Sequence, residues 1–238
     1  VDQRLWVGDI QGGVPVVEDV FGVAFGSSGI PAFTADPGLN AAAGTFSPGS
    51  RIGFNFRAAL AVWNGEGFDP LPADGSAERL RITFFTAAAT SGDGFVPGFD
   101  LQVQPDGGFH KHLGMSLLAP DGASLPTPGT YLMEFELTST DPAVAVSPPY
   151  WFVFDHEADA DAFAAAVDHV RTVIAGPPAD PCPADLDGSG AVDFGDILTT
   201  LGAWGACGEP CPADLDGSGA VDFPDLLGVL SAWGPCPD

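Results

Sequence analysis

The chain contains the stretch Cys182-Pro-Ala-Asp-Leu-Asp-Gly-Ser-Gly-Ala-Val-Asp-Phe194, and it repeats this stretch 29 residues later as Cys211-Pro-Ala-Asp-Leu-Asp-Gly-Ser-Gly-Ala-Val-Asp-Phe223. The following residues also recur, as Leu201-Gly-Ala-Trp-Gly-Ala-Cys207 and Leu230-Ser-Ala-Trp-Gly-Pro-Cys236. A fixed period of this length marks structural repeats that pack on one another. The proline-rich segment 176–181 precedes them and predicts a stiff linker between two domains, 1–175 and 182–238.

Each copy of the repeat places oxygen-bearing residues at the spacing of a calcium-binding loop. Positions 1, 3, 5, 9 and 12 are Asp or Ser, position 6 is a glycine at a sharp turn, and position 7 offers its carbonyl. Ca²⁺ takes about 6–8 oxygen ligands, and this spacing wraps them around one ion. The sequence therefore predicts two calcium ions, with the ligands Asp185, Asp187, Ser189, Ala191, Asp193 and Asp196 in the first loop and Asp214, Asp216, Ser218, Ala220, Asp222 and Asp225 in the second.

Two features qualify this calcium prediction. Position 12 is Asp rather than the longer Glu, so we expect weaker binding than in loops that end in Glu. The alternative interpretation is an acidic, glycine-rich loop that faces solvent without an ion. The full spacing in two copies favours the ion.

A short helix is predicted after each loop, over about 194–204 and 223–233. Neither helix can bury its apolar face alone, so we expect the two faces to pack together in a small all-α domain. These faces consist of Ile197, Leu198, Leu201 and Trp204 in the first helix, and of Leu226, Leu227, Leu230 and Trp233 in the second.

The loop–helix duplication over 182–238 resembles the type I dockerin module, and more closely the Cys-flanked dockerin-like tails of secreted planctomycete proteins. The resemblance implies a role in docking or assembly. Cellulosomal dockerins carry small hydroxyl residues at loop positions 10 and 11, where they contact a cohesin. Here those positions are Phe194-Gly195 and Phe223-Pro224, which argues against a cohesin partner.

All four cysteines frame the repeats, which predicts two disulfides and an oxidising, extracellular compartment. A zinc site is the alternative, but Cys207-x₃-Cys211 with long gaps on both sides fits zinc spacing poorly. Two pairings are sensible. In the first, Cys182–Cys207 and Cys211–Cys236 close each repeat on itself; in the second, Cys182–Cys236 and Cys207–Cys211 join a pseudo-two-fold pair. We favour the first, because both of its partners are duplicated together.

The first 157 residues show the pattern of β-strands. Apolar or alternating runs such as 79–86, 99–104, 110–118 and 131–138 lie between clusters of Gly, Pro and Asp. This spacing predicts a β-sandwich. Apolar residues then recur at helical spacing over 158–175, so one amphipathic helix is expected to close the domain. The predicted fold is therefore mainly β, with one helix after the sandwich and the small calcium-loop domain at the end.

Composition excludes several classes of function. The chain carries 7 Lys and Arg against 32 Asp and Glu, a net charge of −25, and thus lacks the basic surface that nucleic-acid binding requires. No apolar run approaches the ~20 residues of a membrane-spanning helix. Neither G-x-S-x-G, H-E-x-x-H nor a phosphate-binding glycine loop is present, so we expect no enzymatic activity.

One cluster in the first domain has the composition of a transition-metal site. In a strand, His110 and His112 share a face. A hairpin of 109–118 with 129–138 would bring Glu134 or Glu136 beside them, and two His with a carboxylate can bind Zn²⁺ or copper. The alternative is a solvated polar face with cross-strand charge pairs.

Scattered motifs, among them Gly44-Thr-Phe, Arg51-Ile-Gly-Phe-Asn, Val62-Trp-Asn-Gly and Trp151-Phe-Val-Phe, are similar to those of a group of uncharacterised secreted bacterial proteins. Some members are described as zinc-regulated and carry a PEP-type C-terminal sorting signal; here the calcium tail stands in its place. The leading hypothesis is a secreted, non-enzymatic, calcium-binding surface or matrix protein. Its tail would dock another protein or assemble with itself, as in a filament or surface layer. The alternatives are an extracellular zinc- or copper-binding protein and a carbohydrate-active hydrolase with a docking tail.

Overall fold

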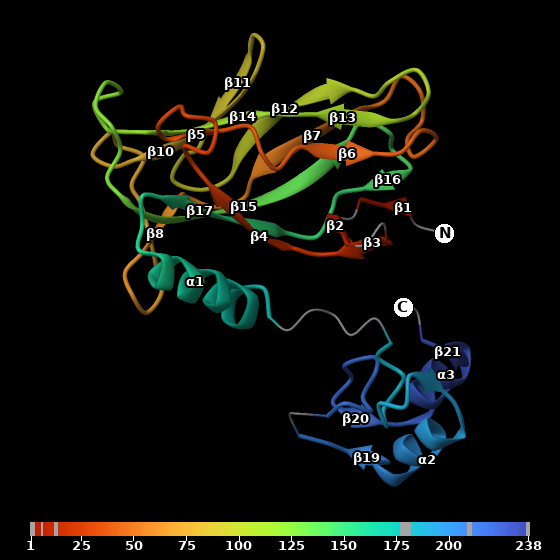
Figure 1. The fold of residues 1–238 in the computed structure, drawn as a ribbon. Coiled ribbons are helices and arrows are strands. Elements are labelled where there is room, and N and C mark those ends of the chain that lie inside the picture. Colours follow the sequence, from red (N-terminus) through yellow and green to blue (C-terminus); the bar gives the residue numbers. More distant parts are fainter. Residues whose placement is uncertain (1–2, 6, 12–13, 177–181, 209–210, 237–238) are drawn as a thin grey trace. The chain divides into compact units, whose positions relative to one another are not determined.

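Residues 3–5, 7–11, 14–176, 182–208 and 211–236 are described by the computed structural model of the chain (Figure 1). The chain divides into two units, Val1–Gly176 and Pro177–Asp238. The prediction of a mainly β chain is confirmed, since most of its regular elements are strands. Of the predicted linker, residues 177–181 lie outside the described residues.

The larger sheet of the first unit has the strand order β12-β7-β15-β17-β4, and β8 and β9 extend it beside β15. Strand β17 pairs in parallel with β4, and the other pairs are antiparallel. Both faces of β15 and β17 are covered, which explains their nearly continuous apolar sequences. The strands are β4 (Val20–Ala24), β7 (Arg51–Phe56), β8 (Ala61–Trp63), β9 (Phe68–Pro70), β12 (Val96–Gln102), β15 (Gly129–Ser139) and β17 (Tyr150–His156).

A smaller sheet with the order β11-β10-β14-β5 packs against the larger one. Its residues Leu80, Ile82 and Met115 share one apolar core with Phe56 and Phe135 of the larger sheet, so the two sheets form packed layers. Its strands are β5 (Phe33–Thr34), β10 (Arg79–Phe84), β11 (Ala87–Thr90) and β14 (Gly114–Leu118). Three short pairs flank them: β1 (Gln3–Arg4) with β16 (Val144–Ala145), β2 (Gly8–Gln11) with β3 (Val14–Val17), and β6 (Leu39–Ala41) with β13 (Phe109–Lys111).

A single helical segment follows the sheets, as predicted over 158–175. It comprises α1 (Ala160–His169) and one wider turn, η1 (Val170–Ile174). Asp159 begins it, because its carboxylate accepts hydrogen bonds from two N–H groups of the first turn. The buried residues of this segment pack on the outer face of the larger sheet, which the segment covers (Figure 1).

The described residues of the second unit form two helices and two small sheets. The helices are α2 (Phe194–Gly202) and α3 (Phe223–Ser231), and the strands are β18 (Ala191–Val192), β19 (Gly205–Ala206), β20 (Ala220–Val221) and β21 (Gly234–Pro235). Strand β18 pairs with β21 and β19 with β20, so the end of each repeat lies beside the loop of the other. The prediction of an all-α domain is therefore not supported: the residues after each helix are extended and pair with the opposite loop.

The expected packing of the two helices is confirmed in part: α2 and α3 contact each other and Ile197 packs on the small core, but most of the predicted apolar faces are not buried. Leu198, Leu201 and Trp204 are about half exposed, and so are their counterparts Leu227, Leu230 and Trp233. The buried positions are Asp196 and Thr200 in α2, and Asp225 and Val229 in α3. The position-12 carboxylate is buried at the start of each helix, and the residue four positions later lies on the same side. Each helix therefore faces the interior of the unit with the side that carries these buried residues, and its leucines and its tryptophan lie on the outward side.

Candidate metal centres

Three carboxylates converge in each repeated loop. Ligand atoms of Asp185, Asp187 and Asp196 lie within 4.8 Å of one another, and the equivalent trio in the second loop is Asp214, Asp216 and Asp225. These residues occupy positions 1, 3 and 12. Like charges at this distance repel one another without a compensating cation. Each group has the charge and the oxygen donors that a hard divalent cation prefers.

The first carboxylate of each loop is held by the turn that follows it. Asp185 accepts hydrogen bonds from the N–H groups of Ser189 (3.0 Å) and Gly190 (2.8 Å). Asp214 accepts the same pair of bonds at the same distances, from Ser218 and Gly219. Both glycines have a φ near +90°, a conformation that glycine adopts without strain. The position-6 glycine therefore shapes the loop around its first carboxylate.

The last carboxylate of each loop is fully buried. Asp196 accepts hydrogen bonds from the N–H groups of Leu186 (2.6 Å), Asp187 (3.2 Å) and Asp193 (2.7 Å). Burial raises the pKa of Asp196, but the bonds from these N–H groups lower it more, so the pKa lies below its ordinary value. This carboxylate is therefore ionised.

The second loop repeats this arrangement at Asp225. Its carboxylate accepts bonds from the N–H groups of Leu215 (2.7 Å), Asp216 (3.3 Å) and Asp222 (2.7 Å). The bond from Asp222 has the largest effect on the pKa of Asp225 and lowers it against the opposing effect of burial. Both loops thus present an ionised, buried carboxylate at position 12.

The remaining predicted ligands brace the loops. The hydroxyl of Ser189 donates to the carbonyl of Ala191 at 3.0 Å, and Ser218 donates to Ala220 at the same distance. Asp193 is the N-cap of α2, where its carboxylate accepts from the N–H of Gly195 at 2.7 Å. Asp222 is the N-cap of α3. The carboxylates of Asp193 and Asp222, at position 9, do not belong to the two groups of three.

The disulfides are Cys182–Cys236 and Cys207–Cys211, so the pairing that we favoured is wrong. The reason is the crosswise strand pairing: Cys236 donates its N–H to the carbonyl of Gly190 (3.0 Å), and Cys207 donates to that of Gly219 (3.2 Å). The end of each repeat thus meets the loop of the other. No described cysteine is free, which removes the zinc–thiolate alternative.

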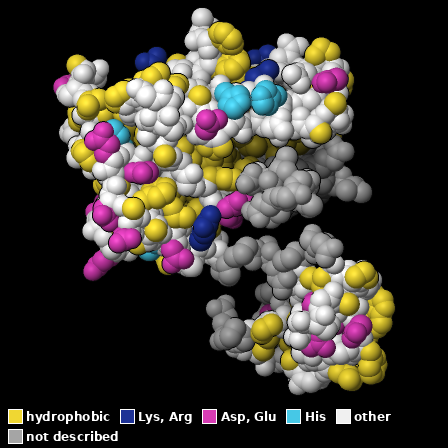
Figure 2. Space-filling model, in the orientation of Figure 1, with side chains coloured by type: hydrophobic (Ala, Val, Ile, Leu, Met, Phe, Trp, Pro, Cys, Tyr) yellow, Lys and Arg dark blue, Asp and Glu magenta, His cyan; other side chains and the backbone are white. Residues whose placement is uncertain are grey.

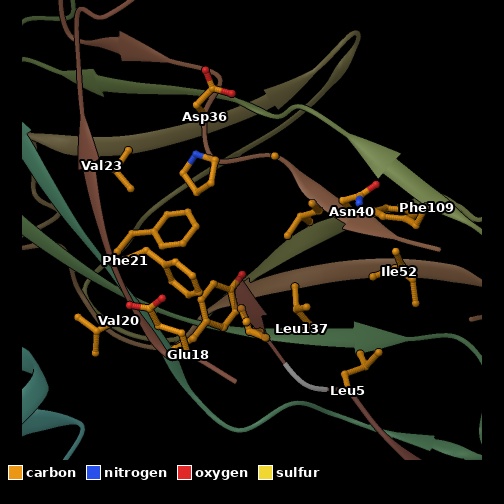
Figure 3. Close-up of a pocket in the computed structure, with 18 of the residues that line it drawn as sticks. Leu5, Glu18, Val20, Phe21, Val23, Asp36, Asn40, Ile52, Phe109 and Leu137 are labelled. Carbon is orange, nitrogen blue, oxygen red and sulfur yellow. The ribbon is translucent and has the colours of Figure 1, made fainter. Parts of the chain in front are cut away.

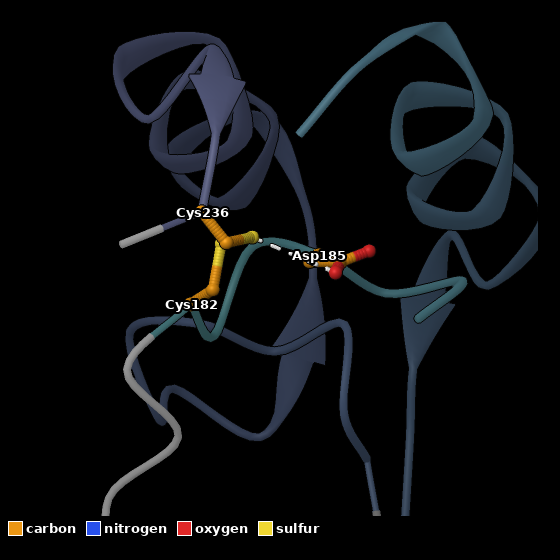
Figure 4. Close-up of side chains that lie close together, drawn as sticks. All are labelled: Cys182, Asp185 and Cys236. Carbon is orange, nitrogen blue, oxygen red and sulfur yellow. Dashed lines mark hydrogen bonds between the residues drawn. A yellow bond between two sulfur atoms is a disulfide. The ribbon is translucent and has the colours of Figure 1, made fainter. Parts of the chain in front are cut away.

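Each disulfide lies against the first carboxylate of a loop. Cys236 Sγ is 3.5 Å from Asp185 Oδ2 (Figure 4), and because a disulfide sulfur carries no hydrogen this is a van der Waals contact. Cys207, Cys211 and Asp214 form the equivalent group in the second loop. The two disulfides therefore occupy equivalent positions, each beside the first carboxylate of one loop.

The predicted hairpin beside His110 and His112 is wrong. The run 110–118 breaks after Lys111: β13 pairs with β6, whereas β14 joins the smaller sheet. Strand β15, which carries Glu134 and Glu136, pairs with β7, β8 and β17 in the larger sheet. The four residues of the predicted transition-metal site are therefore divided between different sheets.

The two histidines nevertheless lie close together, with ring centroids 5.1 Å apart. His110 Nδ1 is 3.1 Å from Asn40 Oδ1, and His112 Nδ1 is 3.1 Å from the carbonyl oxygen of Ala35 and 3.3 Å from Asp36 Oδ1. Within the described ranges, no group of three close metal-ligating side chains includes either ring.

Glu134 and Glu136 bind Arg57, which follows β7. Arg57 Nε is 2.7 Å from Glu134 Oε1, Arg57 Nη1 is 2.6 Å from Glu136 Oε2, and Asn55 donates to Glu136 Oε1 at 2.8 Å. The side-chain hydrogen bond of Glu134, and then that of Glu136, raises the pKa of Arg57. Cross-strand charge pairing, which was part of the alternative to a metal site, is therefore present, but Glu136 is buried rather than solvated.

Replacing Arg57 by Gln is expected to lower the stability of the first unit by about 1–3 kcal/mol, because the buried carboxylate of Glu136 would lose its charged donor. Urea unfolding monitored by circular dichroism measures this loss. The control is Arg51→Gln, whose ion pair with Asp100 is exposed and should contribute at most about 1 kcal/mol. Equal losses in the two variants would contradict a special role for Arg57.

No protein-family model matches this sequence, and no curated protein matches it either. Among the helices of the described residues, none has the length and apolar character needed to cross a membrane.

Proposed function

We propose that the second unit binds two calcium ions and docks a secreted, non-enzymatic surface or matrix protein to a second copy of itself or to another protein. The observation that carries this proposal is the duplication: three carboxylates converge twice, held by equivalent backbone bonds. The donors are oxygens, which favours Ca²⁺ over softer metals. Two disulfides are typical of extracellular proteins. The resemblance to type I dockerins agrees with a docking role.

The negative charge of the second unit also favours the binding of cations. Residues 182–238 contain ten acidic residues and neither Lys nor Arg. Two Ca²⁺ ions would offset four of these charges and relieve the repulsion at each trio of carboxylates. Calcium binding and folding of this unit are therefore expected to be coupled.

The docking surface that we propose is the outward side of the two helices, called here the repeat face. Its large apolar side chains are 46–63% exposed. Exposed apolar surface on this scale marks sites of protein interaction, and Figure 2 shows hydrophobic side chains at the surface of this unit. The repeat face consists of Phe194, Leu198, Leu201 and Trp204 and their counterparts Phe223, Leu227, Leu230 and Trp233.

Light scattering in calcium and in EDTA tests this function. We expect the wild type to associate with rising concentration in calcium, and a Trp204→Ser/Trp233→Ser variant to stay monomeric, because it loses two exposed anchors of the repeat face. The matched control is Phe85→Ser, which removes a 93% exposed aromatic residue from the first unit and should associate like the wild type. A calcium-loaded wild type that is monomeric at every concentration would contradict self-assembly.

A further inference from the structure

The first unit contains a cavity of about 820 Å³ (Figure 3). This volume lies within the ~300–1,000 Å³ that small-molecule sites occupy. Its wall is mostly apolar and includes Phe21, Leu39, Ile52, Phe109, Tyr150 and Phe152. Figure 2 shows a hollow lined with hydrophobic side chains on the face that carries two histidines.

The order of the strands explains why the core of the first unit contains a cavity at this position. Strand β4 ends the larger sheet and β5 ends the smaller one, so the cavity lies where the two layers have their last strands. The chain passes from one layer to the other through the turn after β4, where Gly26 donates its N–H to the carbonyl of Phe33 at 2.9 Å. Beyond this turn, residues of β4 and β6 line opposite walls of the cavity (Figure 3).

Tyr150 offers a hydrogen-bond donor in the apolar wall of this cavity. Its side chain is 4% exposed, yet no described residue makes a hydrogen bond to its hydroxyl. The other tyrosine of the chain, Tyr131, donates to the carbonyl of Thr127 at 2.7 Å. Burial raises the pKa of Tyr150, so its hydroxyl stays protonated and remains a donor. Tyr150 is not among the buried polar atoms that lack a partner, so its hydroxyl is open to the cavity that it lines, and the oxygen of a ligand there can accept its hydrogen bond.

The charges around the cavity limit the ligand. Two carboxylates line it, Glu18 and Asp36. Glu18 pairs with Arg171 at 2.9 Å, and Asp36 lies 3.3 Å from His112. No unpaired cation among the lining residues awaits an anionic head group, and the chain as a whole is strongly negative. A fatty-acid carboxylate is therefore disfavoured relative to a neutral molecule.

We propose that this cavity binds a neutral, largely apolar small molecule, and that the Tyr150 hydroxyl donates a hydrogen bond to the hydroxyl or carbonyl oxygen of that molecule. The apolar wall supplies the binding energy, and Tyr150 fixes the orientation. This site belongs to the first unit and is independent of the calcium loops.

Fluorescence titration of the full chain with N-phenyl-1-naphthylamine, a neutral apolar probe, tests the cavity. We expect saturable binding of one probe per chain and displacement by decan-1-ol. Decanoate should compete at least tenfold less well, because its carboxylate would meet Glu18 and Asp36. Ala41→Trp, which places an indole at the cavity wall, should lose probe binding. Absence of saturable binding by the wild type, or equal competition by decanoate, would overturn the proposal.

Two conservative variants test the role of Tyr150. Tyr150→Phe should weaken binding of decan-1-ol about threefold to tenfold, the range of one neutral hydrogen bond. It should leave the melting temperature of the ligand-free chain nearly unchanged, because the Tyr150 hydroxyl makes no hydrogen bond to the described residues. Tyr131→Phe is the control: it should lower the melting temperature and leave binding unchanged. Unchanged decan-1-ol affinity in Tyr150→Phe would overturn the assignment of Tyr150.

Discussion

Chelation of calcium is expected to abolish the thermal transition of the second unit and to leave that of the first unit in place. An ion in each loop would hold the three carboxylates together, and without a cation they repel one another. The buried apolar cluster of this unit is small, built on Ala184, Val192 and Val229, so it cannot offset that repulsion. Free calcium at 100 times its dissociation constant stabilises a folded unit by about 2.7 kcal/mol per site.

Differential scanning calorimetry with and without EDTA measures this effect, and calcium titration counts the ions. Asp185→Asn and Asp214→Asn should each reduce the stoichiometry from two to one, and the double variant should unfold like the chelated wild type. Asp168→Asn, a change of an exposed carboxylate on α1, is the control and should bind two ions. A single set of transitions that EDTA does not move would refute calcium as a structural element of this chain.

The two disulfides are expected to contribute unequally, although they occupy equivalent places in the repeat. Cys182–Cys236 closes a sequence separation of 54 residues, and Cys207–Cys211 closes one of 4. A cross-link stabilises mainly by restricting the unfolded chain, and more so for longer loops, so the Cys182→Ala/Cys236→Ala variant should lose about 4 kcal/mol and Cys207→Ala/Cys211→Ala about 2 kcal/mol.

Calorimetry in saturating calcium, followed through the thermal transition of the second unit, measures both losses in the full chain. Each double variant is the matched control for the other, since both bonds touch the first carboxylate of a loop. Equal losses would show that the bonds act through these native contacts rather than through the unfolded chain.

The features that the sequence alone determined are local. Alternating and continuous apolar runs predicted a mainly β chain, and helical spacing over 158–175 predicted the segment that closes the first unit. Both follow from periodicity over a few residues, where side-chain direction is set by backbone geometry. The convergence of Asp185, Asp187 and Asp196 is likewise encoded locally, because a turn at a required glycine brings positions 1, 3 and 12 of one loop together.

Tertiary structure alone decided which distant elements meet. The run 110–118 reads as one strand, yet it divides between two sheets, so Glu136 lies beside Arg57 instead of His112. The spacing of the cysteines is compatible with two pairings, and the pairing of β18 with β21 selects Cys182–Cys236. The apolar faces of α2 and α3 were predicted to be buried. The side of each helix that is buried instead carries the position-12 carboxylate, so most of the apolar face is exposed to solvent. Each outcome depends on contacts between segments far apart in the chain, and local spacing carries no information about them.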